Sequence, residues 1–234
     1  MSAKSKAIIK QLKSLGTAKN LAGMARFGIA TDKAFGVPHP ALHAIAKQHR
    51  KDHALALELW ESGYHEARLL AAFVGDPKQV TRAQMDAWVR DFNSWDICDT
   101  VTGHLFEPTP YAFDKAYQWT RSKREFVRRA GLAMMAWLAV HRKRESEETF
   151  LGFFPAIEAV ADDERNFVKK ASSWALRQLG KRSKFLNKHA VASAKRIARA
   201  AEASGSAPGV RAARWVAADV LREITSEKVQ TRLR

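Results

Sequence analysis

The sequence predicts an all-α protein built from stacked pairs of helices. Three observations support this prediction: helix-forming residues dominate, apolar residues recur at helical spacing in nearly every window, and strand patterns are almost absent. The 234 residues, of which 46% are hydrophobic, are enough for a substantial core and exclude a mainly disordered chain. We expect about twelve helices of ordinary length, joined by short loops.

Clusters of glycine, proline and polar residues mark the loops between these helices. They fall at GVPHP (36–40), GDPKQ (75–79), EPTP (107–110), GKRSK (180–184) and SGSAPG (204–209). Thr109-Pro110 and the segment from Ser206 to Pro208 are typical of helix starts, whereas Gly180 is typical of a helix stop. We predict a single domain over residues 1–234, with residues 224–234 as a candidate flexible basic tail.

An internal repeat runs through the second half of the chain. The segments FVRRAGLAMMAWLA, FVKKASSWALRQLG and PGVRAARWVAADVL align without gaps, each with a cation in fourth position, at 126–139, 167–180 and 208–221. Both offsets are 41 residues (167−126 and 208−167). Two-helix units of about this length are typical of HEAT-like repeats. We therefore predict a right-handed superhelical solenoid of HEAT-like (ARM/HEAT-like) helix pairs with a basic concave groove.

The charge balance favours a polyanionic partner. Lysine and arginine outnumber aspartate and glutamate by 40 to 24, which gives a formal net charge of +16. An excess of this size favours nucleic acid first and an anionic membrane surface second. A soluble protein whose surface is simply cationic is the alternative that composition leaves open.

Other features exclude several classes of protein. A single cysteine, Cys98, provides neither an internal disulfide nor a cysteine-rich zinc site. The basic N-terminus lacks the apolar core of a signal peptide, and no stretch is apolar for the ~20 residues that a membrane span needs. His39 and His43, beside a proline-rich turn, are better interpreted as surface or capping histidines than as metal ligands. We expect a cytoplasmic monomer without cofactor, metal or membrane contact.

Helical phase, at about 100° per residue, predicts which side chains are buried. For the helix at 126–138 the buried stripe comprises Phe126, Ala130, Ala133, Met134 and Trp137. Arg129 lies at the edge of this stripe and Arg128 on the far side. For the helix at 167–179 the stripe comprises Val168, Ala171, Ala175 and Leu179.

Six of the seven tryptophans divide into two groups. We assign four of them to the core: Trp60, Trp88, Trp119 and Trp137. Trp174 lies off its stripe between Lys170 and Arg177, and Trp215 follows Arg211 by one turn. An aromatic ring among cations suits stacking on sugars or bases beside phosphates. Packing of Trp215 on the next repeat remains the alternative.

The stretch NSWDICDTVTGHLF (93–106) places an indole and two carboxylates in one helix. Phase buries a stripe that comprises Ile97, Cys98, Val101 and Leu105, so a Cys98 nucleophile is excluded. Trp95, Asp99 and Thr102 share another face, while Asp96 is an early-turn acid favoured by the helix dipole. Because a carboxylate repels a polyanion, binding alone does not explain Asp99. The alternative is a buried salt bridge to Arg129.

These elements, taken in order, resemble a known family. The WDxxD element (95–99), FVRRA (126–130), KKASSWALRQLG (169–180) and FGIATDKAFGVPHPALHAIAKQ (27–48) are similar to the AlkD-type DNA alkylation repair glycosylases. The likeness runs from about residue 20 to about residue 225. It implies a HEAT-like solenoid that wraps duplex DNA, with two tryptophans and an aspartate on the deoxyribose of the alkylated nucleotide.

Matching by motif assigns a role to each of these residues. Asp99 becomes the catalytic carboxylate, Trp95 and Trp174 the paired indoles, and Arg129 the contact to the neighbouring phosphate, with Arg128 as the competitor for that role. Further DNA contacts are expected from Lys169, Lys170, Arg177, Arg211 and Trp215. An N-terminal aromatic that completes the pocket in some members has no clear counterpart in MARFGIATDKAFGV (24–37).

One carboxylate suffices if the leaving base is already activated. Glycoside hydrolysis ordinarily uses two carboxyl groups, one of which protonates the leaving group. Alkylation at N7 of guanine or N3 of adenine makes the base cationic, so this acid is not needed. We therefore expect a monofunctional glycosylase that releases such purines from duplex DNA without full base flipping. The alternatives are a non-catalytic protein that binds branched or damaged DNA, and a scaffold for RNA or an acidic protein.

Overall fold

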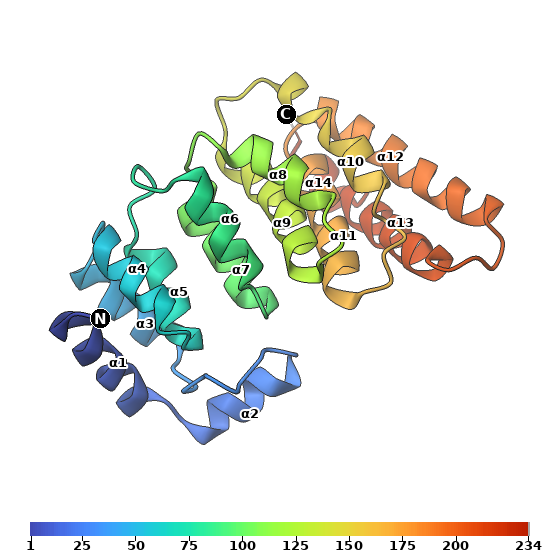
Figure 1. Ribbon diagram of the computed structural model, residues 1–234. Coiled ribbons are helices and arrows are strands. Elements are labelled where there is room, and N and C mark those ends of the chain that lie inside the picture. Colours follow the sequence, from blue (N-terminus) through green and yellow to red (C-terminus); the bar gives the residue numbers. More distant parts are fainter. Residues whose placement is uncertain (234) are drawn as a thin grey trace. The chain divides into compact units, whose positions relative to one another are not determined.

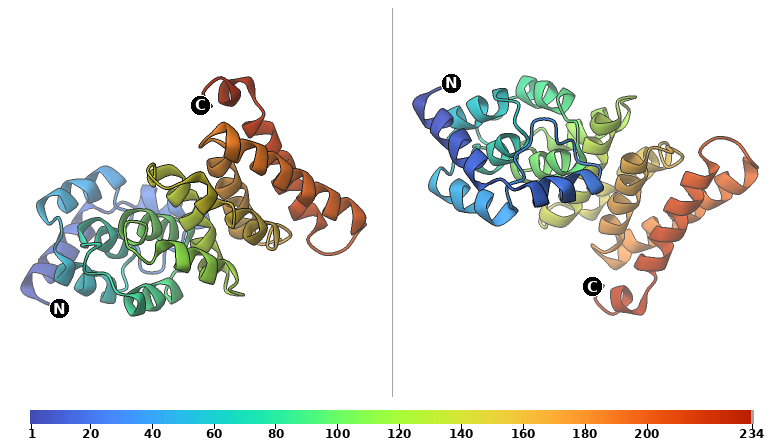
Figure 2. Two further views of the ribbon diagram at one scale, coloured as in Figure 1. Left: turned by 90° about the horizontal axis from the view of Figure 1, so that it is seen from above. Right: turned by 90° about the horizontal axis from the view of Figure 1, so that it is seen from below.

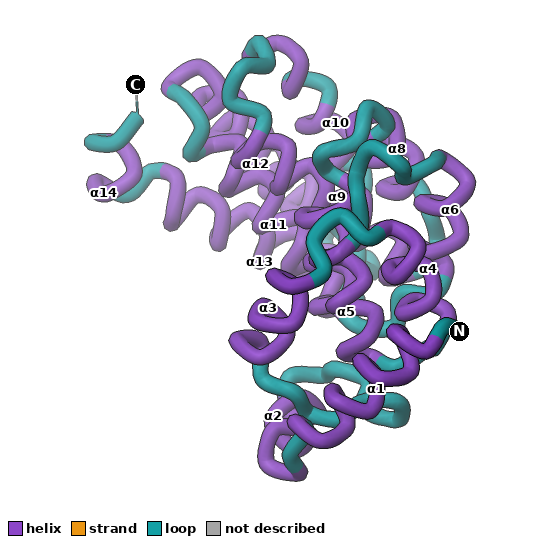
Figure 3. Tube along the Cα trace, turned by 90° about the vertical axis from the view of Figure 1, so that its left-hand side faces the viewer, coloured by secondary structure: helices purple, strands orange, loops and turns teal. Residues whose placement is uncertain are grey.

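The computed structural model describes residues 1–233, and all regular structure in that range is helical (Figures 1 and 3). The all-α prediction is confirmed. The described residues carry helices α1 to α14, somewhat more than the twelve expected. The extra helices include α10 (Phe153–Glu158) and α14 (Glu227–Gln230), which have 6 and 4 residues and are too short to show a helical period.

The chain divides into two compact units, Met1–Pro110 and Tyr111–Arg234. The helices of the first unit are α1 (Ala3–Leu15), α2 (Ala18–Arg26), α3 (His39–Gln48), α4 (His53–Glu61), α5 (His65–Val74), α6 (Arg82–Arg90), α7 (Trp95–Val101) and the π-helix η1 (Thr102–Phe106). Side-chain N-caps begin four of them, namely Ser2, Thr17, Asp52 and Thr81. The predicted loops at 75–79 and 107–110 separate helices, whereas the one predicted at 36–40 ends inside α3, which already begins at His39.

Polar contacts in the first unit recur at a separation of 31 residues. Four pairs have this spacing: Phe35–Glu66, His53–Gln84, Trp60–Asp91 and His65–Asp96. A constant separation means that successive helix pairs stack in one register, as in a repeat protein. The contacting residue types change from pair to pair, so this shorter repeat leaves no visible pattern in the sequence.

The core of the first unit centres on two stacked indoles. The rings of Trp60 and Trp88 lie 4.1 Å apart and almost parallel, and both side chains are buried as predicted. The indole N–H of Trp60 donates to Asp91 at 3.2 Å, which satisfies the only polar atom of that ring.

The second unit contains the 41-residue repeat. Its helices are α8 (Ala112–Thr120), α9 (Glu125–His141), the 3₁₀ helix η2 (Glu147–Phe150), α10, α11 (Asn166–Gly180), α12 (Lys184–Ala203), α13 (Val210–Ile224) and α14. The three repeat segments become α9, α11 and α13, with α11 packed against both others. The equivalent rings Phe126 and Phe167 lie 5.6 Å apart, so matching positions meet directly.

The ends of these helices follow the local sequence. Gly180 is the last residue of α11, as predicted, and Ser183 caps α12. Figure 2 shows α12 (orange) and α13 (red) side by side, joined by the loop at 204–209. The candidate tail forms α14, and Leu233 is 7% exposed, so the segment up to Leu233 is held by the unit. Arg234 lies outside the described residues.

The structure offers no membrane span and no metal cluster within its described residues. None of their helices is long and apolar enough to cross a bilayer. Nor do the described histidine, cysteine, aspartate and glutamate side chains gather in a group of three or more that could hold a metal ion.

Candidate functional site

Helix α7 presents Trp95 and Asp99 on one partly exposed face, one helical turn apart. The opposite stripe is buried as predicted and comprises Ile97, Cys98, Val101 and Leu105. Thr102 was expected beside Asp99, and that prediction is wrong. Its side chain is buried and its hydroxyl donates to the carbonyls of Cys98 and Asp99 at 2.8 and 3.1 Å. By helical phase Thr102 lies only about 40° from Cys98, at the border of the buried stripe, and its hydroxyl turns back onto these two carbonyls.

Asp96 has an environment opposite to that of Asp99. Its carboxylate is buried and accepts hydrogen bonds from Ser94 Oγ at 2.7 Å and Ile97 N–H at 2.9 Å, and it pairs with His65 Nε2 at 2.8 Å. Burial alone would raise the pKa of Asp96, but the hydrogen bond and charge of His65, with the other donors, lower it below its ordinary value. Asp96 is indeed in the first turn, and its role is to hold α7 on α5.

Trp95 binds the backbone of an exposed aromatic residue. The indole N–H of Trp95 donates to the carbonyl oxygen of Phe27 at 3.0 Å, and the Phe27 side chain is 67% exposed. Phe27 follows the last residue of α2, and Gly28 after it has φ 72, which turns the chain. Sequence reasoning found no N-terminal aromatic for the pocket because 68 residues separate Phe27 from Trp95. The one available signal was an unburied aromatic at a helix end.

The loop that carries Phe27 is fixed by a buried carboxylate. Glu66 is 1% exposed and accepts the backbone N–H groups of Phe35, Gly36 and Val37 at 2.6 to 3.2 Å. The backbone N–H of His65 donates to the carbonyl of Lys33 at 2.8 Å. The start of α5 therefore sets the position of the α2–α3 loop, and so of the backbone that Trp95 binds.

A cavity of about 310 Å³ lies between this loop and α7, and its lining includes Lys33, His65, Arg68 and Asn93. Burial lowers the pKa of Arg68, and Asp91 offsets only part of that cost. Lys33 and Arg68 make this side of α7 cationic, although Asp32 also borders the cavity.

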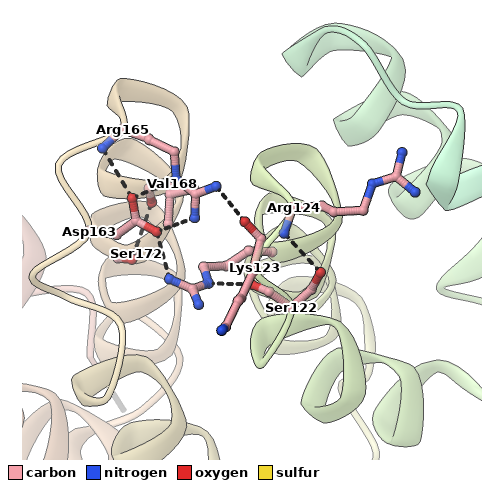
Figure 4. Close-up of polar contacts among 8 residues, drawn as sticks. Ser122, Lys123, Arg124, Asp163, Arg165, Val168 and Ser172 are labelled. Carbon is pink, nitrogen blue, oxygen red and sulfur yellow. Dashed lines mark hydrogen bonds and ion pairs between the residues drawn. The ribbon is translucent and has the colours of Figure 1, made fainter.

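In the second unit, Arg129 is 6% exposed and its Nη1 donates to the carbonyl of Phe167 at 2.7 Å. Arg128, expected on the far side of α9, is partly buried and donates to Ser122 O and to Asp163, each at 2.7 Å. Figure 4 shows Asp163 also binding Arg165. Burial tends to raise the pKa of Asp163, but its bonds to Arg165 and Arg128 lower it. Arg128 therefore joins the loops that precede α9 and α11.

Trp174 is partly exposed, as phase predicts, and its ring meets that of Trp137 edge-on at 5.4 Å. Trp137 was assigned to the core, and this is wrong: it is partly exposed, as is Phe126. Helical phase puts both residues within the predicted stripe, but each ring contacts a ring of α11, Phe167 or Trp174, instead of entering the interior. Trp119 is buried as predicted.

The expected DNA contacts on α11 and α13 differ in their surroundings. The ammonium of Lys169 lies 5.0 Å from the ring centre of Trp215, which is 38% exposed. Lys170 and Arg211 are exposed. Arg177 instead forms ion pairs with Asp219, at 3.6 Å, and with Glu223. The structure thus brings Phe27, Trp95 and Asp99 together in the first unit, and Lys169 with Trp215 in the second.

Comparisons with known proteins show which fold and which family this architecture matches. A solved structure described as "A new family of proteins related to the HEAT-like repeat DNA glycosylases with affinity for branched DNA structures" is similar to this chain, with a TM-score of 0.73. The match has 24% sequence identity and covers 81% of each chain, which confirms the predicted HEAT-like fold. A search among curated proteins found no match. A family model described as "DNA alkylation repair enzyme" matches residues 8–206. Since this match spans most of the sequence, the chain belongs to the DNA alkylation repair enzyme family.

Proposed function

We propose that this protein is a monofunctional DNA glycosylase that removes N7-alkylguanine and N3-alkyladenine from duplex DNA, acting as a cytoplasmic monomer. One observation carries the proposal. Of the two carboxylates in the WDxxD element, Asp96 is buried against His65, whereas Asp99 is partly exposed one turn from Trp95. Membership of the DNA alkylation repair enzyme family supports removal of alkylated bases as the reaction in which such a carboxylate takes part.

Asp99 acts on the sugar rather than on the base. An alkylated purine leaves as a neutral molecule, so the glycosidic bond breaks without a general acid and the charge moves to an oxocarbenium-like sugar. A carboxylate ~4 Å from that charge contributes ~1 kcal/mol at the dielectric of water and ~4 kcal/mol at an effective dielectric of 20. This corresponds to roughly tenfold to thousandfold in rate. The same carboxylate positions the attacking water.

The aromatic residues stabilise the same charge and exclude bulk water. The hydrogen bond to the Phe27 carbonyl fixes the indole of Trp95, and Trp137 supports the ring of Trp174. Each indole face contributes about 0.5–2 kcal/mol of cation–π stabilisation to a cationic sugar. Phe27, exposed beside Trp95, takes the place of the N-terminal aromatic that sequence matching lacked.

The cations bind the DNA backbone. We assign direct contacts to Lys169, Lys170, Arg211 and Trp215. We keep Arg129 for the phosphate beside the lesion, and because it is 6% exposed and donates to the carbonyl of Phe167, its guanidinium has to turn outward to reach that phosphate. Arg128 and Arg177 already bind carboxylates of this chain, so they support the backbone-binding surface indirectly.

Base release measures the proposed reaction directly. Duplex DNA that contains N7-methylguanine is incubated with wild-type protein, Asp99→Asn and the control Glu61→Gln, which changes an exposed acid on α4. We expect release by the wild type and by Glu61→Gln, and a fall of about tenfold to a thousandfold in Asp99→Asn because the charge opposite the sugar cation is lost. Wild-type release no faster than spontaneous loss, or undiminished release by Asp99→Asn, would contradict the proposal.

A non-catalytic role is the second candidate. It is favoured by the fold neighbour, which has affinity for branched DNA structures. Binding of a four-way junction and of plain duplex to the same preparation separates the two roles. Tighter binding to the junction, together with no base release, would assign this second function.

A further inference from the structure

A second cationic groove lies in the first unit, away from Trp95. It has a volume of about 510 Å³ and is formed by α3 and the turn after it, by α5 and its following loop, and by η1. Figure 3 shows α3 and α5 side by side. Its charged or titratable lining residues are His43, Lys47, Arg50, Lys51 and His104. None of the described residues that line it is acidic.

The three permanent cations of this groove lack bonded partners among the described residues. Lys47, Arg50 and Lys51 are exposed, and none forms an ion pair or side-chain hydrogen bond with a described residue. Other cations of the chain do so: Arg128 binds Asp163 and Arg196 binds Glu158. Compensation inside the molecule is therefore limited to the long-range attraction between Lys51 and Asp76, whose pKa is lowered mainly by its hydrogen bonds to Gln79 and Lys78 and only slightly by the charge of Lys51.

The two acids next to the groove in sequence make their hydrogen bonds elsewhere, although Asp76 also feels the charge of Lys51. Asp52, which follows Lys51, binds Lys4 at 2.5 Å and caps α4 by accepting the N–H of Leu55. Asp76 accepts hydrogen bonds within its own turn, from the backbone N–H of Lys78 and from Gln79 Nε2. Neither carboxylate forms an ion pair with a groove cation.

Planar rings line the floor between these cations. The ring of Phe73 lies 4.5 Å from that of His43 and 4.9 Å from that of His104, the latter edge-on. His104 belongs to the π-helix, a local widening that is frequent at functional sites. Lys51 has φ 62, a left-handed conformation that is uncommon for residues other than glycine. Cations beside exposed rings are suited to phosphates and the apolar edges of sugars.

We propose that this groove binds the phosphodiester backbone of double-stranded DNA, as a contact separate from the lesion site. Trp95 and His104 lie nine residues apart on the continuous α7–η1 helix. At 1.5 Å per residue this places them on the order of 14 Å apart along the axis. That distance is the axial rise of about four nucleotides of one strand. The inference rests on the proposed function only in taking DNA as the ligand.

The test compares two triple variants that remove the same charge. The first combines Lys47→Gln, Arg50→Gln and Lys51→Gln. The control combines Lys6→Gln, Lys10→Gln and Lys13→Gln on α1, three lysines that are likewise exposed and unpaired among the described residues. Affinity for undamaged duplex is measured by fluorescence anisotropy at several salt concentrations, so catalysis is not required.

We expect the groove variant to reduce the magnitude of the slope of log K against log[salt] by about 2.7, since each of three phosphate contacts contributes about 0.9. Affinity at 0.1 M salt should fall on the order of a hundredfold. The α1 variant should change much less, because it affects only the long-range field. Equal losses in the two variants, or unchanged binding in the groove variant, would overturn the proposal.

A second measurement separates this inference from the proposed function. With protein in saturating excess over damaged DNA, the single-turnover rate of base release should be the same for the groove variant and the wild type. A fall in that rate at saturation would mean that the groove takes part in catalysis, which contradicts a separate contact. If the wild type releases no base at all, the binding result still stands by itself.

Discussion

At the scale of single residues, environment separates two carboxylates that the sequence places three residues apart. The motif alone marks both Asp96 and Asp99, and helical phase sends them to different faces. Phase cannot show that Asp96 is buried, because its partner His65 lies 31 residues earlier on α5. The same limit hid Phe27, whose contact with Trp95 depends on how the α2–α3 loop folds back.

The buried Asp96–His65 pair predicts a specific dependence of stability on pH. The folded-state pKa of Asp96 lies below its ordinary value, 3.8, so the carboxylate stabilises the fold above that value. This contribution is lost as pH falls from about 5 toward and through the folded-state pKa. Asp96→Asn should therefore lower the free energy of unfolding by about 3 kcal/mol at pH 7, where it leaves His65 without its carboxylate.

Urea unfolding at a series of pH values measures this difference. The difference in the free energy of unfolding between the wild type and Asp96→Asn should be largest near neutral pH and should narrow as the solution is acidified. A constant gap from neutral to strongly acidic pH would show that Asp96 acts through packing rather than through its charge.

At the scale of helices and loops, prediction succeeds where a regular helix continues. The stripe of Val168, Ala171, Ala175 and Leu179 is fully buried, and Gly180 ends its helix. Prediction fails for Thr102, which borders the buried stripe of α7 and whose hydroxyl bonds back to the carbonyls of the preceding turn. It also fails for Trp137, since phase gives a direction from the helix axis and not the distance to the next helix. Phase therefore predicts the direction of a side chain better than its burial.

Glu66 predicts how the α2–α3 loop responds to a single change. Glu66→Gln keeps the size of the side chain but replaces one acceptor oxygen with an NH₂ group that faces backbone N–H donors. Each buried N–H left without an acceptor costs about 1–3 kcal/mol. We expect faster hydrogen exchange at the backbone amides of Phe35, Gly36 and Val37, with no change in α11. Unaltered exchange at these three amides would mean that the loop is held by other contacts.

At the scale of the whole molecule, the visibility of a repeat depends on which residues make its contacts. The 41-residue repeat of the second unit is readable because apolar and cationic positions recur in register, from Phe126 to Phe167. The 31-residue register of the first unit uses a different donor and acceptor in each copy, so it appears only in three dimensions. The assignment of Asp99 and the two indoles came from family resemblance, because no pattern in one sequence links residues so far apart.

The net charge of +16 predicts how the whole fold responds to salt. Screening weakens both the repulsion among excess cations and the attraction within ion pairs, with a Debye length of about 30 Å at 0.01 M and about 8 Å at 0.15 M. Exposed ion pairs contribute only about 0–1 kcal/mol each, whereas the unpaired cations repel one another across the whole surface. The loss of repulsion should therefore dominate, and salt should stabilise the fold.

Thermal unfolding followed by circular dichroism tests this sign. Between 0.01 and 0.15 M sodium chloride we expect Tm to rise by several degrees, since about 1 kcal/mol corresponds to roughly 2–4 °C for a chain of this size. Sucrose at matched osmolarity provides the control for effects other than screening. The same increase in salt weakens DNA binding, so stability and affinity should move in opposite directions. A falling Tm would instead show that internal pairs such as Arg128–Asp163 outweigh the surface repulsion.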